Sequence, residues 1–131
     1  MSTSRILVVD DEPDVVETIE FCLEHEGYEV LTASNGLEGL GAARALKPDL
    51  ILLDVMMPGE NGYRVAQMIR ADESALPEDP VPIILLTARD LSSDPEREQM
   101  FMNFSQANLI IYKPFAMDDL LLRSEELLPV H

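Results

Sequence analysis

The sequence has few of the features that mark extracellular or membrane proteins. Only one of its 131 residues is a cysteine, so the chain cannot form an internal disulfide, and a reducing compartment is expected. Cys22 lies in an apolar segment and is interpreted as a small core residue rather than a nucleophile. No apolar run is long enough for a membrane span or a signal peptide. A cytoplasmic protein is therefore expected.

Basic residues are also scarce. Lys and Arg total 9 against 25 Asp and Glu, which gives a formal net charge of −16. Nucleic acids and anionic membranes bind basic surfaces, so this charge argues against direct contact with either. It is compatible with metal cations and basic partner surfaces, and equally with an acidic protein that binds neither.

Glycine-rich phosphate loops, internal repeats and interdomain linkers are absent. Neither G-x-G-x-x-G nor G-x-x-x-x-G-K-[ST] occurs, which argues against a flavin- or nucleotide-binding module of those kinds. Hydrophobic residues make up 47% of the chain, enough for an ordinary core. We therefore expect residues 1–131 to form a single domain.

Short apolar runs alternate along the chain with segments of helical period. The runs are Ile6–Val9, Glu29–Thr32, Leu50–Leu53, Ile83–Thr87 and Asn108–Tyr112. The helical segments are Asp14–Glu26, Leu37–Leu46, Tyr63–Ala71, Pro95–Ser105 and Met117–Leu128. Five repeats of strand then helix predict an α/β fold, with a parallel sheet and helices on both faces. Continuous apolar runs such as ILVV suit strands that are covered on both sides.

Chemically active side chains follow the predicted strands. Asp10 and Asp11 end the first strand, Asp54 the third, Thr87 the fourth and Lys113 the fifth. The carboxyl ends of parallel strands meet at one edge, where such sheets bind ligands. Carboxylates there would suit Mg²⁺, and the hydroxyl and ammonium would suit an anion. Taken singly, Asp11 could be a helix N-cap, Thr87 an ordinary strand residue and Lys113 a solvated lysine.

Four segments in this order resemble the receiver domain of a two-component response regulator: ILVVDDEPD, PDLILLDVMMPGENGY, PIILLTAR and YKPF. The resemblance covers nearly the whole chain. It implies a flavodoxin-like (βα)₅ fold, with a five-stranded parallel sheet in the order 2-1-3-4-5. It also implies a phospho-accepting signalling module whose donor is a histidine kinase or a histidine phosphotransfer protein. Such a module is not an enzyme beyond its own phosphorylation and slow dephosphorylation.

The resemblance implies roles at the metal site. Asp11 would bind Mg²⁺ directly and Asp10 through water, while Asp54 and the main-chain carbonyl of Met56 would complete the protein ligands. Glu12 is expected at the edge of the site with no assigned role. The pair Pro13-Asp14 is expected to start the first helix.

The resemblance also implies roles toward the phosphoryl group. Asp54 would be the phosphoacceptor. Lys113 would pair with Asp54 and then hold a phosphoryl oxygen, and Thr87 would bond the group once it arrives. The backbone N–H groups of Met56 and Ala88 would help to bind it. A cis peptide bond is expected between Lys113 and the following proline.

The sequence departs from the family pattern near its fifth strand. The family's usual aromatic residue is replaced by Ile110, and the usual GAD before this strand reads QAN. Tyr112 lies two residues from Ile110 and could supply the missing aromatic, or it could simply pack against a neighbouring helix. The segment Asp90–Pro95 carries extra residues, and the acidic, proline-rich segment Ala71–Pro82 is interpreted as a solvated loop.

Two further questions stay open at the level of sequence. An aspartate-based, Mg²⁺-dependent phosphatase would need an acid two residues after the nucleophile, but Val55 and Met56 follow Asp54. The output is not encoded in a recognisable segment, so a stand-alone receiver and a piece of a larger regulator are both compatible. The expected switching surface lies on the fourth helix, the fifth strand and the fifth helix.

Overall fold

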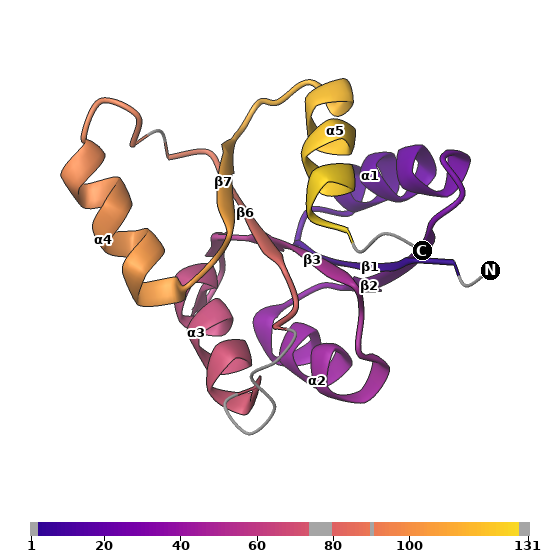
Figure 1. Ribbon diagram of the computed structural model, residues 1–131, viewed down its shortest axis with the longest axis horizontal. Coiled ribbons are helices and arrows are strands. Elements are labelled where there is room, and N and C mark those ends of the chain that lie inside the picture. The colour runs from indigo at the N-terminus through magenta and orange to yellow at the C-terminus, as the bar shows by residue number, and fades with distance from the viewer. Residues whose placement is uncertain (1–2, 74–79, 90, 129–131) are drawn as a thin grey trace.

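A five-stranded parallel sheet forms the centre of the protein (Figure 1). The computed structural model describes residues 3–73, 80–89 and 91–128. The strands of the sheet are β1 (Arg5–Val9), β2 (Glu29–Ala33), β3 (Leu50–Asp54), β6 (Ile83–Thr87) and β7 (Leu109–Tyr112). Their spatial order is β2-β1-β3-β6-β7, and every neighbouring pair is parallel. Numbered among themselves in chain order, these strands have the predicted order 2-1-3-4-5.

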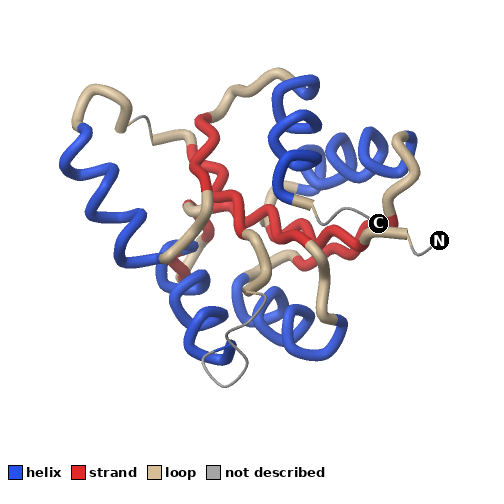
Figure 2. The backbone as a smooth tube through the Cα atoms, viewed as in Figure 1, coloured by secondary structure: helices blue, strands red, loops and turns tan. Residues whose placement is uncertain are grey.

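Helices cover both faces of the sheet, as Figure 2 shows with the strands between two helical layers. The helices are α1 (Pro13–His25), α2 (Gly36–Leu46), α3 (Gly62–Glu73), α4 (Pro95–Ser105) and α5 (Met117–Leu127). Helices α1 and α5 lie on one face, and α2 and α3 lie on the other. The predicted flavodoxin-like arrangement is confirmed, and the predicted helix bounds differ from the observed ones by at most two residues.

Each strand contributes alternate side chains to two apolar cores, which explains the continuous apolar runs in the sequence. In β1, Ile6 and Val8 pack toward α1 and α5, whereas Leu7 and Val9 pack toward α2 and α3. All four are fully buried. Cys22 is only half-buried on α1 and belongs to neither core, so the prediction that it is a core residue is wrong.

A short antiparallel hairpin follows β3 and was not predicted as strands. It consists of β4 (Met56–Met57) and β5 (Glu60–Asn61), joined by a turn in which Gly59 has a φ of 74°. Gly62 then packs so closely on β3 that a Cβ atom would collide with the carbonyl oxygen of Asp54. The glycines therefore let this hairpin fold back over the end of β3.

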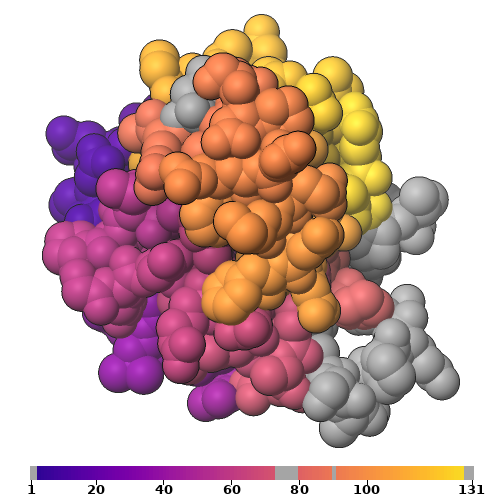
Figure 3. Space-filling view, turned by 90° about the vertical axis from the view of Figure 1, so that its left-hand side faces the viewer, coloured from indigo at the N-terminus to yellow at the C-terminus, as the bar shows by residue number. Residues whose placement is uncertain are grey.

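Helix α4 packs mainly on α3 and fills the middle of the face seen in Figure 3. The rings of Tyr63 and Phe101 stack with centroids 4.4 Å apart and an interplanar angle of 8°. The Tyr112 hydroxyl donates a hydrogen bond to the carboxylate of Glu98 on α4. Tyr112 therefore contacts a neighbouring helix, as its plainer interpretation predicted.

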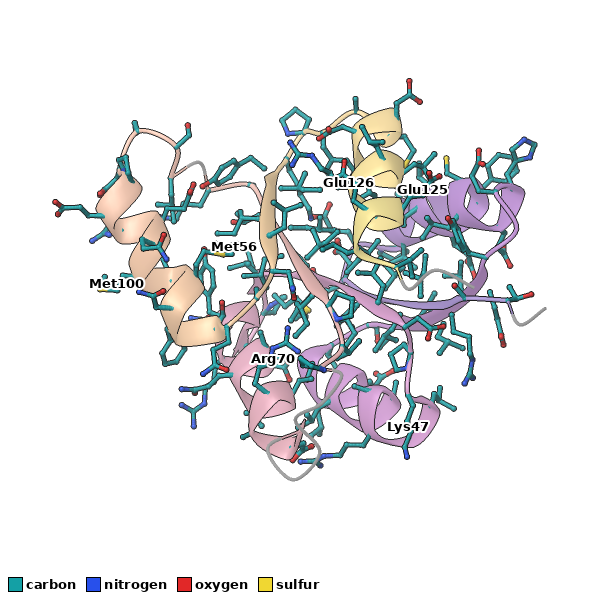
Figure 4. The ribbon with its side chains drawn as sticks, viewed as in Figure 1. Lys47, Met56, Arg70, Met100, Glu125 and Glu126 are labelled. Atoms are coloured by element: carbon teal, nitrogen blue, oxygen red, sulfur yellow. The ribbon has the colours of Figure 1, made fainter. Side chains whose placement is uncertain are left out.

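Arg70 ties together the amino-terminal ends of β6 and β7 (Figure 4). Its guanidinium donates to the carbonyl oxygens of Gln106 and Val81, and to the side-chain oxygen of Asn108. The same oxygen of Asn108 accepts from the backbone N–H of Ile83 at 2.9 Å. The unusual QAN segment is therefore part of a cross-link between α3, β6 and β7.

Some expectations fall on parts of the chain that the structure does not describe. Residues 74–79, in the middle of the expected loop Ala71–Pro82, and Asp90, at the start of the expected insertion, lie outside the described residues. Within the described ranges, no helix is long and apolar enough to cross a membrane.

Candidate functional site

The carboxyl-terminal edge of the sheet brings the predicted site residues together. Asp10 directly follows β1, Asp54 is the last residue of β3, Thr87 ends β6 and Lys113 follows β7. The parallel pairing of these four strands places their ends side by side. The peptide bond between Lys113 and its proline is cis, as the resemblance implied.

Lys113 is the central cation of this edge. Its Nζ lies 3.1 Å from Oδ2 of Asp10, 3.4 Å from Oδ1 of Asp54 and 3.7 Å from Oε1 of Glu12. Asp10 and Asp54 are only 1% and 2% exposed, so these two ion pairs are shielded from water. One ammonium therefore holds together carboxylates from two neighbouring strands.

The two buried carboxylates are not equally satisfied. The second oxygen of Asp10 accepts a hydrogen bond from the backbone N–H of Glu12 at 3.0 Å. Oδ1 of Asp54 accepts from Lys113 and, at 3.4 Å, from the backbone N–H of Met56. Oδ2 of Asp54 is buried and has no hydrogen-bond partner among the described residues. Burial of such an atom lowers the stability of the folded state unless a group outside the chain binds it.

Burial raises the pKa of the Asp54 carboxyl to about 6, and the negative charge of Asp10 acts in the same direction. The ammonium of Lys113 opposes both effects. Burial alone would lower the pKa of Lys113, but the carboxylates of Asp10 and Asp54 outweigh it and raise that pKa above its usual value. An additional cation beside Asp54 would therefore favour its ionised form.

The donor atoms fit a hard divalent cation. Carboxylate oxygens of Asp10, Asp11 and Glu12 lie within 4.8 Å of one another. Among the described residues, the carboxylate of Asp11 has no hydrogen bond or ion pair. Together with the partnerless oxygen of Asp54, this leaves oxygen donors free on both strands. Glu12, which was expected at the edge of the site without a role, is part of this acidic cluster.

Thr87 and Ala88 lie at the same edge, and among the described residues they form no hydrogen bond with the acidic group. Thr87 is fully buried, and its Oγ1 accepts a hydrogen bond from the backbone N–H of Arg89 at 3.1 Å. Within the described part of the chain, no hydrogen bond joins Thr87 to the carboxylate of Asp54. Ala88 is exposed beside Thr87, and Met56 is 61% exposed on the other side.

A cavity of about 620 Å³ opens next to these residues. Its walls come from the end of β1, the β4–β5 hairpin, α3, the residues after β6, and α4. It is lined by Asp11, Glu12, Val55, Met56, Met57, Pro58, Glu60, Asn61, Tyr63, Arg89 and Phe101. Asp11 and Glu12 of the acidic group therefore face an open space that also has apolar and basic walls.

Comparisons with known proteins agree with this geometry. Residues 6–125 match the family described as "Response regulator receiver domain". The DNA-binding response regulator MtrA of Mycolicibacterium smegmatis is 39% identical over 119 residues, which are 91% of this chain and 48% of that protein. The DNA-binding dual master transcriptional regulator RpaA of Synechocystis is 37% identical over 95% of this chain and 48% of its own length. The chain thus spans about half the length of these relatives.

Solved structures show the same fold. The response regulator TrrA of Thermotoga maritima, in complex with Mg²⁺ and BeF, is 37% identical with a TM-score of 0.80, over 96% of this chain and 100% of that one. The chemotaxis protein CheY4 of Vibrio cholerae is 29% identical with a TM-score of 0.84, over 97% of this chain and 100% of that one. The likeness therefore extends over the whole sheet and the helices around it.

Proposed function

Because this chain belongs to the receiver-domain family of two-component response regulators, we propose that residues 1–131 form a single domain that accepts a phosphoryl group on Asp54. One observation carries the proposal: the buried carboxylate of Asp54 contacts Lys113 through one oxygen and keeps the other without a partner among the described residues. A carboxylate can act as the nucleophile that forms an aspartyl phosphate.

The reaction is the transfer of a phosphoryl group from a phosphohistidine. A carboxylate oxygen of Asp54 forms a bond to phosphorus while the P–N bond breaks, and the imidazole leaves with that electron pair. The carboxylate must be ionised, which its burial opposes. The ammonium of Lys113 stabilises the ionised form before transfer, and a phosphoryl oxygen afterwards.

The donor set supports Mg²⁺ binding at this site. Asp11 would bind the ion directly and Asp10 through water, while Asp54 and the carbonyl oxygen of Met56 would complete the protein ligands. When bound, the ion supplies positive charge that favours the ionised acceptor and offsets charge on the transferring oxygens. Glu12 helps to position Lys113 through the 3.7 Å ion pair.

The remaining groups bind the phosphoryl group after transfer. Thr87 would exchange its present hydrogen bond from the N–H of Arg89 for a contact in which its hydroxyl donates to a phosphoryl oxygen. The backbone N–H groups of Met56 and Ala88 would donate to the other oxygens. These changes start at the ends of β3 and β6, and we expect them to pass to the face formed by α4, β7 and α5.

The proposed donor is a histidine kinase or a histidine phosphotransfer protein, and the chain itself would catalyse only its own phosphorylation and slow dephosphorylation. Its output would depend on a protein partner or on a further domain, since the related MtrA and RpaA are named DNA-binding regulators and are about twice as long. Aspartate-based phosphatase chemistry receives no support, because no acid stands two residues after Asp54.

The test is incubation with acetyl phosphate and Mg²⁺, followed by intact-mass spectrometry. We expect the wild-type chain to gain the mass of one phosphoryl group and Asp54→Asn to gain none. Asp14→Asn is the matched control, because Asp14 lies nearby in the first turn of α1 but outside the acidic cluster. Uptake by Asp54→Asn equal to that of the wild type, or no uptake by the wild type, would contradict the proposal.

A further inference from the structure

Glu60 lies in the β4–β5 hairpin that follows Asp54, and it joins this hairpin to α2. Its carboxylate accepts a hydrogen bond from the backbone N–H of Gly36, the first residue of α2. Glu60 is half-buried and lines the cavity beside the acidic group. It also lines a second cavity, of about 510 Å³, whose other walls come from α2 and α3. Glu60 therefore connects the surroundings of Asp54 to α2.

The start of α2 has both a donor and the space for this carboxylate. The first backbone N–H groups of a helix have no partner within the helix, and the helix dipole favours a negative charge near them. The Asn35 side chain accepts from the N–H of Glu38 at 2.8 Å. Glu60 accepts from the N–H of Gly36. A Cβ atom at position 36 would collide with the Glu60 carboxylate and lie 2.7 Å from Cγ2 of Val65, so the contact requires a glycine there.

The β4–β5 hairpin also carries Met56, whose main chain contacts Asp54. The backbone N–H of Met56 donates to Oδ1 of Asp54 at 3.4 Å, which is longer than usual for such a bond. In the hairpin, Met56 pairs with Asn61, and Met57 pairs with Glu60. Each strand of the hairpin has only two residues, and so short a hairpin is not stable by itself. The position of Met56 therefore depends on the contacts that hold the hairpin to the rest of the protein.

The other end of the hairpin is held separately. The N–H of Gly62 donates to the carbonyl oxygen of Val55 at 2.9 Å, and the side chain of Asn61 accepts from the N–H of Tyr63 at 2.9 Å. These bonds fix the hairpin to the start of α3, whereas the bond to Glu60 fixes it to α2. Loss of the Glu60 contact should therefore let the hairpin shift while the protein stays folded.

We propose that Glu60 is a positioning residue for the metal site, because its hydrogen bond from α2 keeps the main chain of Met56 in place beside Asp54. The inference rests on the proposed function, in which Met56 supplies a main-chain oxygen to Mg²⁺ and an N–H to the phosphoryl group. Glu60 contacts neither the ion nor the phosphoryl group, and it acts only through the hairpin. Its part in the site is that of a hydrogen-bond acceptor, not of a negative charge.

The test measures the dissociation constant of Mg²⁺ from the rise in melting temperature as the ion is added, relative to each variant's own metal-free value. Glu60→Leu loses the acceptor, so its dissociation constant should rise roughly tenfold, as for other groups that support metal ligands. Glu60→Gln removes the same charge but keeps an oxygen that accepts from Gly36, so its constant should stay within roughly threefold of the wild type. Gly36→Ala keeps the charge but displaces the carboxylate, so its constant should rise as in Glu60→Leu.

Glu38→Leu is the matched control. It removes an acid from the first turn of α2, but the Glu38 side chain bonds to Ser34 and Asn35 and not to the hairpin. An unchanged dissociation constant in Glu60→Leu or in Gly36→Ala would overturn the inference, and so would an equal rise in Glu38→Leu. A Glu60→Gln variant that binds as weakly as Glu60→Leu would show that the charge acts and not the anchor, which would also overturn it.

Phosphorylation separates this inference from the function on which it rests. With acetyl phosphate and saturating Mg²⁺, Glu60→Leu should still gain the mass of one phosphoryl group. Absence of the adduct in this variant alone would contradict a role that acts only through position. If the wild type forms the adduct but the dissociation constants do not differ, the role of Glu60 is wrong and the function of Asp54 stands. Absence of any adduct in the wild type would overturn both proposals.

Discussion

The two edges of the sheet differ in how their charged groups are paired. At the amino-terminal edge, the guanidinium of Arg70 donates hydrogen bonds to Val81, Gln106 and Asn108. At the carboxyl-terminal edge, Asp54 is buried, and one of its oxygens has no partner among the described residues. Both edges place charge against the ends of β-strands. At the first, each of the three guanidinium nitrogens donates to an uncharged oxygen, and at the second several carboxylates compete for one ammonium.

The difference separates what holds the fold together from what the protein binds. A polar network whose members are all paired stabilises a fold, and loss of one member leaves several groups unpaired. A buried charge that is only partly paired costs stability, unless a ligand completes it. We therefore expect substitutions at the two edges to change stability in opposite directions.

The largest expected effect is at the amino-terminal edge. Arg70→Met keeps much of the side-chain volume but removes the hydrogen bonds that Arg70 donates to Val81, Gln106 and Asn108. The free energy of unfolding should fall by about 2–4 kcal/mol, measured by chemical denaturation. Arg44→Met is the control, because Arg44 pairs with Asp72 on the surface and should lose under about 1 kcal/mol. Equal losses of unfolding free energy in Arg70→Met and Arg44→Met would show that the Arg70 network adds no more stability than a surface ion pair.

At the carboxyl-terminal edge the sign should reverse. Without divalent cations, Asp54→Asn removes a buried charge and should raise the free energy of unfolding by about 1–3 kcal/mol near pH 8. Because folding raises the pKa of Asp54 to about 6, its contribution to stability is present below about pH 4 and is lost as the pH rises through about 6. The gain should therefore nearly vanish near pH 4. A gain that does not change with pH would contradict the assigned cause.

Cation binding should stabilise the folded protein at the carboxyl-terminal edge of the sheet. Mg²⁺ should raise the melting temperature of the wild type, with a stabilisation of about 1.4 kcal/mol at a concentration roughly ten times its dissociation constant. Asp11→Ala should blunt this rise, since Asp11 offers an unpaired carboxylate. Asp14→Ala should respond as the wild type does, because it lies outside the cluster. If Asp11→Ala responds fully to Mg²⁺, the metal assignment is wrong.

The smallest expected effect concerns the link between the site and α4. Thr87 and Tyr112 are register partners across β6 and β7, and the Tyr112 hydroxyl bonds to Glu98. Tyr112→Phe should cost about 0.5–1.5 kcal/mol and speed hydrogen exchange in α4. Tyr28→Phe should change neither, because the Tyr28 hydroxyl has no hydrogen bond to the described residues. Unchanged exchange in Tyr112→Phe would mean that this hydrogen bond does not hold α4.

The sequence allowed the fold to be predicted because local pattern and global topology agree. Continuous apolar runs and helical periods define the strands and helices, and parallel connectivity then places Asp10, Asp54, Thr87 and Lys113 at one edge. These residues follow strands directly, so their positions depend little on side-chain detail. The roles of Asp11, Met56 and Ala88 are implied by the resemblance to the family.

Other features could not be read from the chain. The hairpin β4–β5 consists of two-residue strands, which are too short to give a periodic signal in the sequence. The positions of Glu12 and Arg89 depend on how loops fold back over the sheet edge. The cross-link of Arg70 joins residues that are 11 to 38 positions apart, which no local pattern indicates.

The central claim is that Asp54, and not a neighbouring acid, receives the phosphoryl group. After treatment with acetyl phosphate and Mg²⁺, cleavage at basic residues separates a peptide of residues 45–64 from the peptide that holds Asp10, Asp11 and Glu12. Tandem mass spectrometry should find the adduct on Asp54 within residues 45–64, and no adduct on the other peptide. A phosphoryl group on Asp10 or Asp11, or on Asp49 within the same peptide as Asp54, would contradict the account.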